Sequence, residues 1–479
     1  MKKMLFLLFA ICFAGQLHAT DLMDIYQQAL ENDPTFKEAY STYMATSESI
    51  PIARSALYPQ LNVNAQVSRN IIQTKTANVN FETTYNSNKW QITASQAVFN
   101  YRAWSQVQQA KATVKAAQAT FNNAAQDLML RTARAYFNIL LARDTLTFAE
   151  AKRRANRRQL EQAEERFRVG LDAITSVYEA RSAYDQSVAQ VITARNDLIN
   201  QSENLRKLTN HVYEYLAPLR DSRIPLIRPE PNDVNEWVDT GLKQNYNLYS
   251  AKYSLQAARE NIRVQAAAGW PTLAIQANGN QVNSDVNGIG GSSGGNFFAP
   301  SKQTNANIAL ALNFPVFQGG LVVAQTRQAQ FNFQSASERL ERAYRDVVVN
   351  SRIAFNTIID GISKVQADRQ TVISQRNTLE STEAQFQVGT RTMVDVVNAQ
   401  ERLFEAQRQL AADQYDLINA DLNLKYLAGT LSVTDLEEIN SWLATTRISR
   451  FPPPLPHKGK IKSKRIVKKT IKTTVTVTK

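Results

Sequence analysis

The fold of this chain is decided by two short runs, FRVGL at residues 167–171 and FQVGT at residues 386–390. Gly170 is the only glycine between residues 61 and 217, and that stretch contains no proline. The stretch 321–428 also lacks proline, and Gly389 is one of its two glycines. Glycine and proline are the strongest punctuators of local structure. Each stretch therefore predicts a very long helical hairpin that turns at its glycine, a shape typical of rods and ducts rather than of enzyme cores.

The chain contains two copies of one pattern. Motifs recur in the same order at an offset of 212 to 219 residues: ALYPQL at 56–61 with AGWPTL at 268–273, then VF at 98–99 with 316–317, FxVG at 167–170 with 386–389, and LI at 198–199 with 417–418. Ordered matches of this kind indicate internal duplication. We predict one repeat over 20–209 and a second over 232–429, joined by a proline-containing linker at 210–231.

The first nineteen residues read as a signal peptide. Lys2 and Lys3 precede an apolar run, and Ala19 is the expected last residue before cleavage. The run is shorter than the roughly 20 residues that a membrane-spanning helix needs. We therefore expect an exported chain without such a helix. The single cysteine, Cys12, would leave with the signal, so we expect no disulfide and no thiolate metal site.

The net charge of +13 is concentrated at the C-terminus. Residues 457–479 carry nine Lys or Arg and no acidic residue, which leaves the body of the chain nearly neutral. A basic tail alone does not indicate a nucleic-acid partner, and we expect none. We interpret 452–479 as a basic disordered tail, with contact to acidic envelope polymers or to partner subunits as the alternative.

Each copy changes its periodicity in the same sequence. A short helix (35–57; 246–268) precedes residues that alternate between apolar and polar side chains, then a polar loop (73–87; 283–302) and a second alternating strand. The long hairpin follows, over about 102–169 with 174–207, and 321–388 with 393–427.

The four predicted strands are about 10 residues long, the length of a tilted membrane strand. Aromatic residues at the strand ends fit interfacial girdles, although the alternation alone also fits a soluble sheet. Four strands cannot close a barrel, so several chains would have to share one, and three chains would give twelve strands. The proposed interfacial aromatics are Tyr58, Trp90, Phe99, Trp270 and Phe317.

With NFPVFQGG at 313–320 and the paired Val-Gly tips, this order of elements resembles the TolC family of outer-membrane efflux proteins over residues 21–449. The resemblance implies an α+β, mostly helical homotrimer. Its twelve-stranded outer-membrane barrel would continue into a periplasmic helical barrel, with residues 430–451 packed around the middle. It also implies an exit duct for tripartite efflux pumps and type I secretion. The partners would be a periplasmic adaptor (membrane fusion) protein and an inner-membrane RND, ABC or MFS transporter.

The resemblance places function at the hairpin tips. Three positions depart from the family pattern: Ser176 and Asn398 stand where Asp is expected, and Phe386 where Tyr is expected. We therefore expect a tip held by fewer charged contacts. The implied adaptor-docking residues are Val169, Gly170, Leu171, Val388, Gly389 and Thr390. The implied gate and selectivity residues are Thr175, Ser176, Phe386, Arg391, Asp395 and Asn398, with an exposed i, i+4 ion pair as the alternative for Arg391 and Asp395.

The sequence offers little other chemistry. Outside the signal, only His211 and His457 remain as histidines. The glycine-rich run 288–295 lacks the Lys-Ser/Thr of a phosphate-binding loop. We therefore expect no enzyme, no cofactor and no metal site.

The rival interpretation is a trimeric envelope spacer or adhesin stalk without a conducting path. Such a stalk needs a sustained apolar heptad seam. The Ala- and Gln-rich helices fit that requirement less well.

Overall fold

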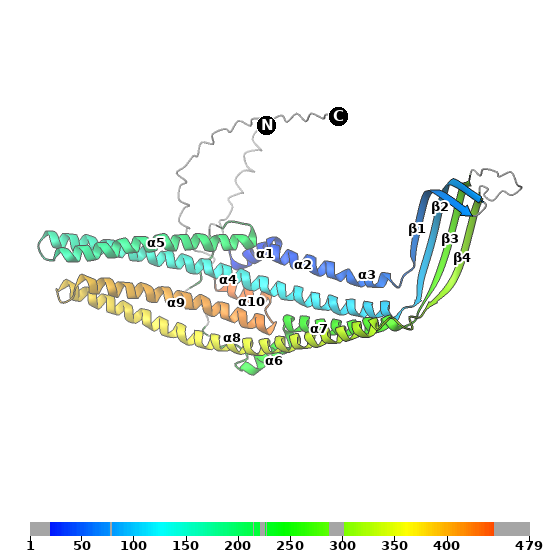
Figure 1. Ribbon diagram of the computed structural model, residues 1–479. Helices are drawn as coiled ribbons and strands as arrows, with labels where there is room; N and C mark the ends of the chain where they lie inside the picture. Colours follow the sequence, from blue (N-terminus) through cyan, green and yellow to red (C-terminus); the bar gives the residue numbers. More distant parts are fainter. Residues whose placement is uncertain are drawn as a thin grey trace, which may run out of the picture.

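The computed structural model describes residues 20–76, 79–213, 215–220, 226, 228–286 and 301–444. The expected signal peptide, the basic tail at 452–479 and the glycine-rich run at 288–295 lie outside these residues. The molecule is elongated, with a sheet at one end, the turns of two long helical hairpins at the other, and shorter helices around the middle (Figure 1).

The two long hairpins confirm the expectation drawn from the two proline-free, glycine-poor stretches. The descending helices are nearly equal in length, with 68 residues in α4 and 67 in α8, or about 100 Å each. Each predicted hairpin boundary lies within two residues of the observed one. The hairpins are α4 (Tyr101–Arg168) with α5 (Ile174–Thr209), and α8 (Leu321–Gln387) with α9 (Met393–Ala428).

Each repeat opens with three short helical segments, and the first of the three was not predicted from the sequence. Asp33 accepts a hydrogen bond from the Phe36 amide, and Asn245 accepts one from the Leu248 amide, at equivalent positions of the two copies. These side chains cap the second segment of each repeat and so separate it from the first. The helices are α1 (Leu22–Asn32), α2 (Pro34–Ser47) and α3 (Ser49–Ser55), then α6 (Val234–Gln244), α7 (Tyr246–Ala266) and η1 (Ala267–Gly269).

Four antiparallel strands form one sheet in the order β1-β2-β3-β4. The predicted polar loop at 73–87 is wrong: β1 and β2 stay paired out to Thr76 and Val79, because Thr, Asn and Tyr side chains suit a solvated ladder as well as a loop. The loop predicted from residue 283 likewise begins later, after Val286. The strands are β1 (Gln60–Thr76), β2 (Val79–Phe99), β3 (Thr272–Val286) and β4 (Ser301–Asn313), which is longer than the ten residues expected.

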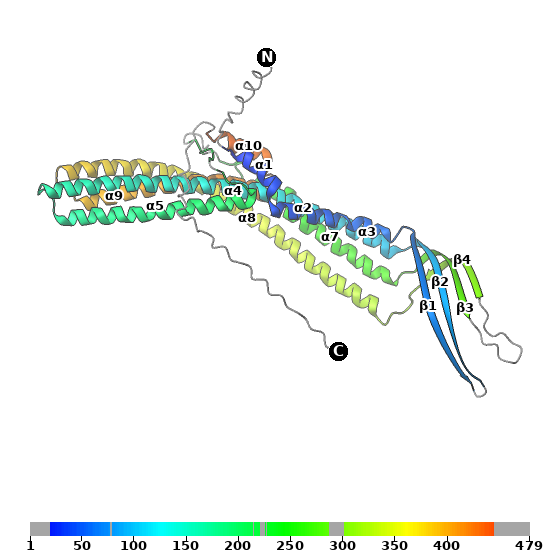
Figure 2. The ribbon, with the colours of Figure 1, turned by 90° about the horizontal axis from the view of Figure 1, so that it is seen from above.

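The largest hydrophobic cluster lies at the middle of the molecule, where α1, α4, α9 and α10 (Val433–Ser441) meet (Figure 2). Tyr136 is fully buried there and donates a hydrogen bond to the Ala217 carbonyl oxygen at 2.7 Å. Burial raises the pKa of Tyr136 well above its ordinary value. The segment after α9 contributes Leu431, Leu436 and Leu443 to this cluster, so it packs against the waist of the molecule.

Candidate functional site

The sheet has one apolar face and one polar face. Residues paired across neighbouring strands lie on the same face, and successive residues alternate between faces. The polar face carries cross-strand contacts such as the hydrogen bond from Gln91 Nε2 to Asn278 Oδ1 at 2.8 Å. One row across the four strands is Leu61, Ala94, Ala277 and Ile308. The adjacent row is Asn62, Thr93, Asn278 and Asn307.

Both outer strands of the sheet leave one edge unpaired among the residues that the structure describes. There, β1 pairs only with β2, and β4 pairs only with β3. The apolar side chains of these strands are the most exposed in the sheet: Val67 is 80% and Ile308 81% exposed. A single chain therefore presents an open, strongly apolar edge, which is a template for pairing with another chain.

The aromatic residues expected at the interfaces lie on and beside this sheet. Tyr58, Phe99, Trp270 and Phe317 are exposed at its helix-proximal end. Trp270 is held by Tyr101, whose ring centre lies 4.8 Å from that of the indole. Trp90 pairs with Ala65 on the apolar face, nine residues along β2 from Phe99.

The two hairpin tips have the same backbone geometry. Gly170 has φ +77° and donates to the Phe167 carbonyl, and Leu171 donates to the Arg166 carbonyl. Gly389, at φ +78°, donates to Phe386, and Thr390 to Gln385, in the same pattern. These paired bonds form the Schellman motif, which ends a helix at a left-handed residue. The Val-Gly run is therefore duplicated because each hairpin needs a glycine at the left-handed residue that ends its first helix.

Exposed apolar side chains surround both glycines. Val169 is 64%, Leu171 67% and Val388 75% exposed. A Cβ atom added to either glycine would meet no atom within 4 Å. The tips therefore present exposed apolar side chains beside each glycine, and exposed apolar patches mark interaction sites.

The helices that return from the two tips begin differently. Thr392 and Asp395 cap each other reciprocally, with the Thr392 amide donating to Asp395 Oδ2 at 3.0 Å and the Asp395 amide donating to Thr392 Oγ1 at 3.3 Å. Ala173, the residue before α5, makes no side-chain cap hydrogen bond. These hydrogen bonds to the Thr392 amide and hydroxyl, with the nearby Arg391, hold the pKa of Asp395 below its ordinary value.

Among the described residues, the polar side-chain contacts of Arg391 lie within the second hairpin. Its Nη1 lies 3.8 Å from Asp395 Oδ1, and its Nε donates to Gln385 Oε1 at 3.2 Å. Within the part of the chain that the structure describes, no hydrogen bond joins Arg391 to Thr175. Of the other expected gate residues, Thr175 and Asn398 are exposed and Ser176 is half-buried.

Phe386 lies at the junction of the two hairpins, and the residues that hold it were not predicted from the sequence. The ring is 7% exposed and packs in a cluster with Val177 of α5 and Met393 of α9. The Arg166 guanidinium lies over it, 5.0 Å from the ring centre, and Arg166 Nε forms an ion pair with Asp172 at 2.8 Å. The Arg-x5-Asp spacing around Gly170 was visible in the sequence, but nothing in it pointed to Phe386.

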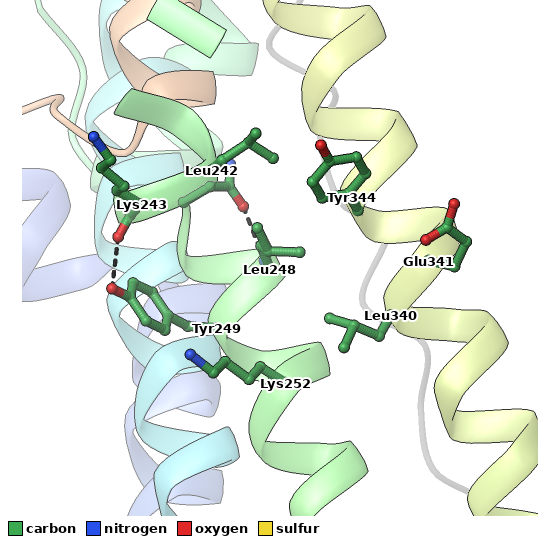
Figure 3. A pocket seen from close by; sticks show the side chains of 9 residues that line it. Leu242, Lys243, Leu248, Tyr249, Lys252, Leu340, Glu341 and Tyr344 are labelled. Carbon is green, nitrogen blue, oxygen red and sulfur yellow. Dashed lines mark hydrogen bonds between the residues drawn. The ribbon is translucent and has the colours of Figure 1, made fainter. Parts of the chain in front are cut away.

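Two grooves lie on the helical body, away from the hairpin tips. A groove of about 520 Å³ lies between α6, α7 and α8, where Tyr249 donates from its hydroxyl to the Lys243 carbonyl at 2.5 Å and Tyr344 faces it from α8 (Figure 3). A larger groove, of about 770 Å³, runs between α4, α5 and α9 and includes Lys152 and Glu401.

Across the described ranges, no three His, Cys, Asp or Glu residues are placed to hold a metal ion. No helix in those ranges is long and apolar enough to cross a membrane.

Comparison with known proteins identifies the family. The sequence pattern of the family described as outer membrane efflux protein matches residues 25–211 and 237–430. The chain belongs to the outer membrane efflux protein family. It is 35% identical to the outer membrane protein TolC of Escherichia coli K12 over 96% of this chain and 94% of that protein. It is 28% identical to the alkaline protease secretion protein AprF of Pseudomonas aeruginosa, over 90% of this chain and 89% of that one.

The outer membrane efflux protein fold is also found in solved structures. The Campylobacter jejuni CmeC outer membrane channel matches 89% of this chain and 90% of its own length, with a TM-score of 0.72 and 16% identity. Family membership makes this chain an outer-membrane efflux channel that extends into the periplasm. The resemblance drawn from the repeated tips is thereby confirmed.

Proposed function

We propose that three copies of the chain form a continuous duct, with a twelve-stranded barrel in the outer membrane and a helical barrel below it. The duct passively conducts drugs or proteins to the outside, as the exit of tripartite efflux pumps and type I secretion systems. An inner-membrane transporter of the RND, ABC or MFS class supplies the energy, and a periplasmic adaptor joins the transporter to the duct.

The two unpaired edges of the sheet are the observation that carries this proposal. An open sheet edge is not tolerated in lipid, because its amide and carbonyl groups would have no hydrogen-bond partner there. The apolar row that begins at Leu61 and ends at Ile308 faces one side across all four strands. That row suits lipid, and the Asn-rich row behind it suits a water-filled lumen. Pairing β4 of one copy with β1 of the next removes every edge.

The aromatic positions give this barrel a membrane thickness. Nine residues separate Phe99 from Trp90, which is about 30 Å along a strand. A tilt of about 45° reduces that to a height of about 21 Å, close to the apolar band of an outer-membrane barrel. Tyr58, Trp270 and Phe317 would lie at the periplasmic interface with Phe99. The parts of β1 and β2 beyond Trp90 would then project from the membrane.

The hairpin tips would dock the adaptor. The supporting observations are the identical glycine turns and the exposed apolar residues beside them. Three copies would present six such tips in a ring. The docking residues are Val169, Gly170, Leu171, Val388, Gly389 and Thr390.

The gate would lie immediately above the tips. Asp395 is the acidic residue that would form a ring of three carboxylates, and Arg391 would hold its side chain in place. With Ser176 and Asn398 in place of acids, one ring gives weaker cation selectivity than two. Thr175 and Phe386 would complete the constriction.

The proposal is tested with the purified full chain. Native mass spectrometry should give three copies, and planar bilayers should show single channels of small conductance, because the tips are closed at rest. A monomer in detergent, or trimers that never conduct, would contradict the proposed duct.

A further inference from the structure

The polar face of the sheet is nearly free of charge along most of its length. Its rows run across the four strands, from the row that contains Gln60 to the row that contains Ser68. Most residues in these rows are Asn, Gln, Ser or Thr, and Lys89 is the one charged residue among them. Amides and hydroxyls both donate and accept hydrogen bonds, so they do not discriminate between cations and anions. Any charge preference of this face therefore comes from Lys89.

The position of Lys89 on the polar face follows from its neighbours in β2. Gln91, two residues along the strand, makes the cross-strand hydrogen bond to Asn278 on that face. Successive residues of a strand alternate between faces, so Lys89 faces the same side as Gln91, and Trp90 faces the other. The Lys89 side chain is exposed, and among the described residues it forms no ion pair and no hydrogen bond. Its charge is therefore not neutralised by those residues.

The row that contains Lys89 also supplies hydrogen-bond donors. From β1 to β4 it reads Gln66, Lys89, Val282 and Gln303. Gln66 and Gln303 are exposed, and each amide offers two N–H groups to an anion. The rows from Gln60 to Ser68 contain no aspartate or glutamate that would compete for the ammonium group. One cation with an amide on either side suits phosphate, sulfate or carboxylate groups, which accept charge-assisted hydrogen bonds.

The charged residues on the opposite face of the sheet have a different explanation. Arg69, Asp285 and Lys302 lie in the two rows just beyond that of Trp90, and they include both signs. Charged side chains at that height on the outer face would reach lipid headgroups and water. Lys89 is next to Trp90 in the strand but faces inward, so anchoring to headgroups does not account for it.

Three copies of the chain would place three Lys89 side chains at one height inside the barrel. Twelve strands spaced about 4.8 Å apart and tilted by about 40° enclose a ring roughly 24 Å across. A lysine side chain reaches about 6 Å from the backbone, so three extended side chains would bring their ammonium groups to roughly 10 Å from one another. That spacing is close to the Debye length of about 8 Å at physiological salt. The three charges therefore repel one another weakly, yet one compact ligand can contact more than one of them.

We propose that the three Lys89 ammonium groups form a binding site for one multivalent anion at the exit of the duct. Its occupant is a cluster of phosphates, sulfates or carboxylates on the exported molecule. A small monovalent ion on the barrel axis is affected weakly, because salt screens the ring. The exit then favours anionic groups, whereas Asp395, near the start of α9 at the other end of the molecule, would favour cations (Figure 1). The site rests on the proposed function, because one chain supplies only one Lys89.

Anion enrichment beside Lys89 is measured with a fluorophore on Gln66→Cys, the position opposite Lys89 in the strand pair, with Cys12 replaced by Ser. Iodide is the anionic quencher and acrylamide the neutral one, so the ratio of their quenching constants reports the local anion concentration. At low salt, Lys89→Gln should lower this ratio about two-fold or more, and Lys89→Arg should preserve it. Lys302→Gln is the matched control: it removes the same charge from the outer face and should leave the ratio unchanged.

The shared site is tested by competition with myo-inositol hexakisphosphate, a compact multivalent anion. It should cancel the iodide excess of the parent at a concentration at least about a hundredfold below that of acetate, because it contacts several lysines at once. The same should hold for Lys89→Arg, and 1 M KCl should remove the effect. Residues 457–479 are the same in every variant, so anions bound there do not distinguish the variants.

The possible failures are distinguishable. Equal quenching ratios in the parent and Lys89→Gln would overturn the assignment of anion preference to Lys89. An iodide excess that the hexakisphosphate cancels no better than acetate would overturn the shared site. Native mass spectrometry of the same samples reports assembly separately. Chains that remain monomeric would overturn the proposed duct and the site with it, whereas intact trimers that show neither effect would overturn the anion site alone.

Discussion

Thr392 and Asp395 cap each other at the start of α9, with the Asp395 carboxylate accepting hydrogen bonds from both the amide and the hydroxyl of Thr392. The residue proposed to select cations is therefore also a structural residue of the second tip. Its two roles can be separated, because an amide oxygen replaces the carboxylate as an acceptor but carries no charge.

Asp395→Asn should reduce the cation preference of the channel while trimers remain intact. The cap keeps an acceptor but loses the charged part of its hydrogen bonds. Reversal potentials in asymmetric KCl measure the preference. Asp185→Asn, at an exposed aspartate of α5, is the control and should change nothing. An unaltered reversal potential in Asp395→Asn would remove the filter role and leave the cap.

Bulky substitution at the tip glycines should abolish export without preventing assembly. Gly170→Val and Gly389→Val place a branched side chain at a left-handed residue, at a cost of about 1–2 kcal/mol or somewhat more. No neighbouring atom is close enough to clash, so trimers should form. Export by a cell carrying the matching adaptor is the readout. Gly279→Ala, in β3 with open space around it, should export normally. Normal export by both tip variants would refute docking at these turns.

Gly429 should respond differently from the tip glycines. It ends α9 at φ +75°, and an added Cβ would lie 2.4 Å from the Gln244 carbonyl oxygen. Gly429→Ala therefore combines backbone strain with a clash against another backbone, and should lower stability by more than about 3 kcal/mol. Thermal unfolding compares it with Gly170→Ala, which carries only the backbone strain. Equal midpoints for the two variants would contradict the packing between α9 and the α6–α7 turn.

A carboxyl pair in the second hairpin should make stability depend on pH. Lys364 Nζ lies 2.6 Å from Asp413 Oδ1, whereas the half-buried Asp368 has one oxygen without a hydrogen-bond partner. Burial and the adjacent Asp413 raise the pKa of Asp368 to about 6. Between pH 4 and 6 the folded chain therefore binds more protons at Asp368 than the unfolded chain does, and this group lowers stability as pH rises. The pKa of Asp413 is lowered, because the Asp368 and Lys364 hydrogen bonds outweigh burial, so it works in the opposite direction.

Asp368→Asn isolates the contribution of that carboxyl. The variant should be more stable than the parent at pH 7.5 and equal to it at pH 4. Thermal midpoints at the two pH values measure the difference. The ion pair between Lys364 and Asp413 is present in the parent and in the variant. Asp416 lies near Lys364 and Asp413 and is also unchanged. A variant that gains as much at pH 4 as at pH 7.5 would show that the raised pKa is not the cause.

The glycine and proline positions were enough to predict the hairpins, because each long proline-free stretch has a glycine at its turn and at most one other, Gly361, which lies inside α8. The strand ends were not predictable in the same way, since residues such as Thr83, Thr84 and Asn86 suit a solvated ladder and a loop equally. Asp33 and Asn245 divide their segments through single capping hydrogen bonds that periodicity does not register.

The candidate site was predicted only in part. The turn residues were visible because the repeat duplicates them. The contact between Arg166 and Phe386 was not, because it joins residues 220 positions apart in the two different copies. Only the packing of one hairpin against the other brings them together.

Closure of the sheet between chains is the central claim, and disulfide trapping across the two free edges tests it most directly. With Cys12 replaced, single cysteines at Asn62, Asn64 or Gln66 of β1 are combined with one at Asn305, Asn307 or Ala309 of β4, and the purified protein is oxidised and run on denaturing gels. We predict that at least one combination gives covalent dimers and trimers and nothing larger. The absence of cross-linked chains in every combination, or a ladder that continues beyond three, would contradict the twelve-stranded barrel.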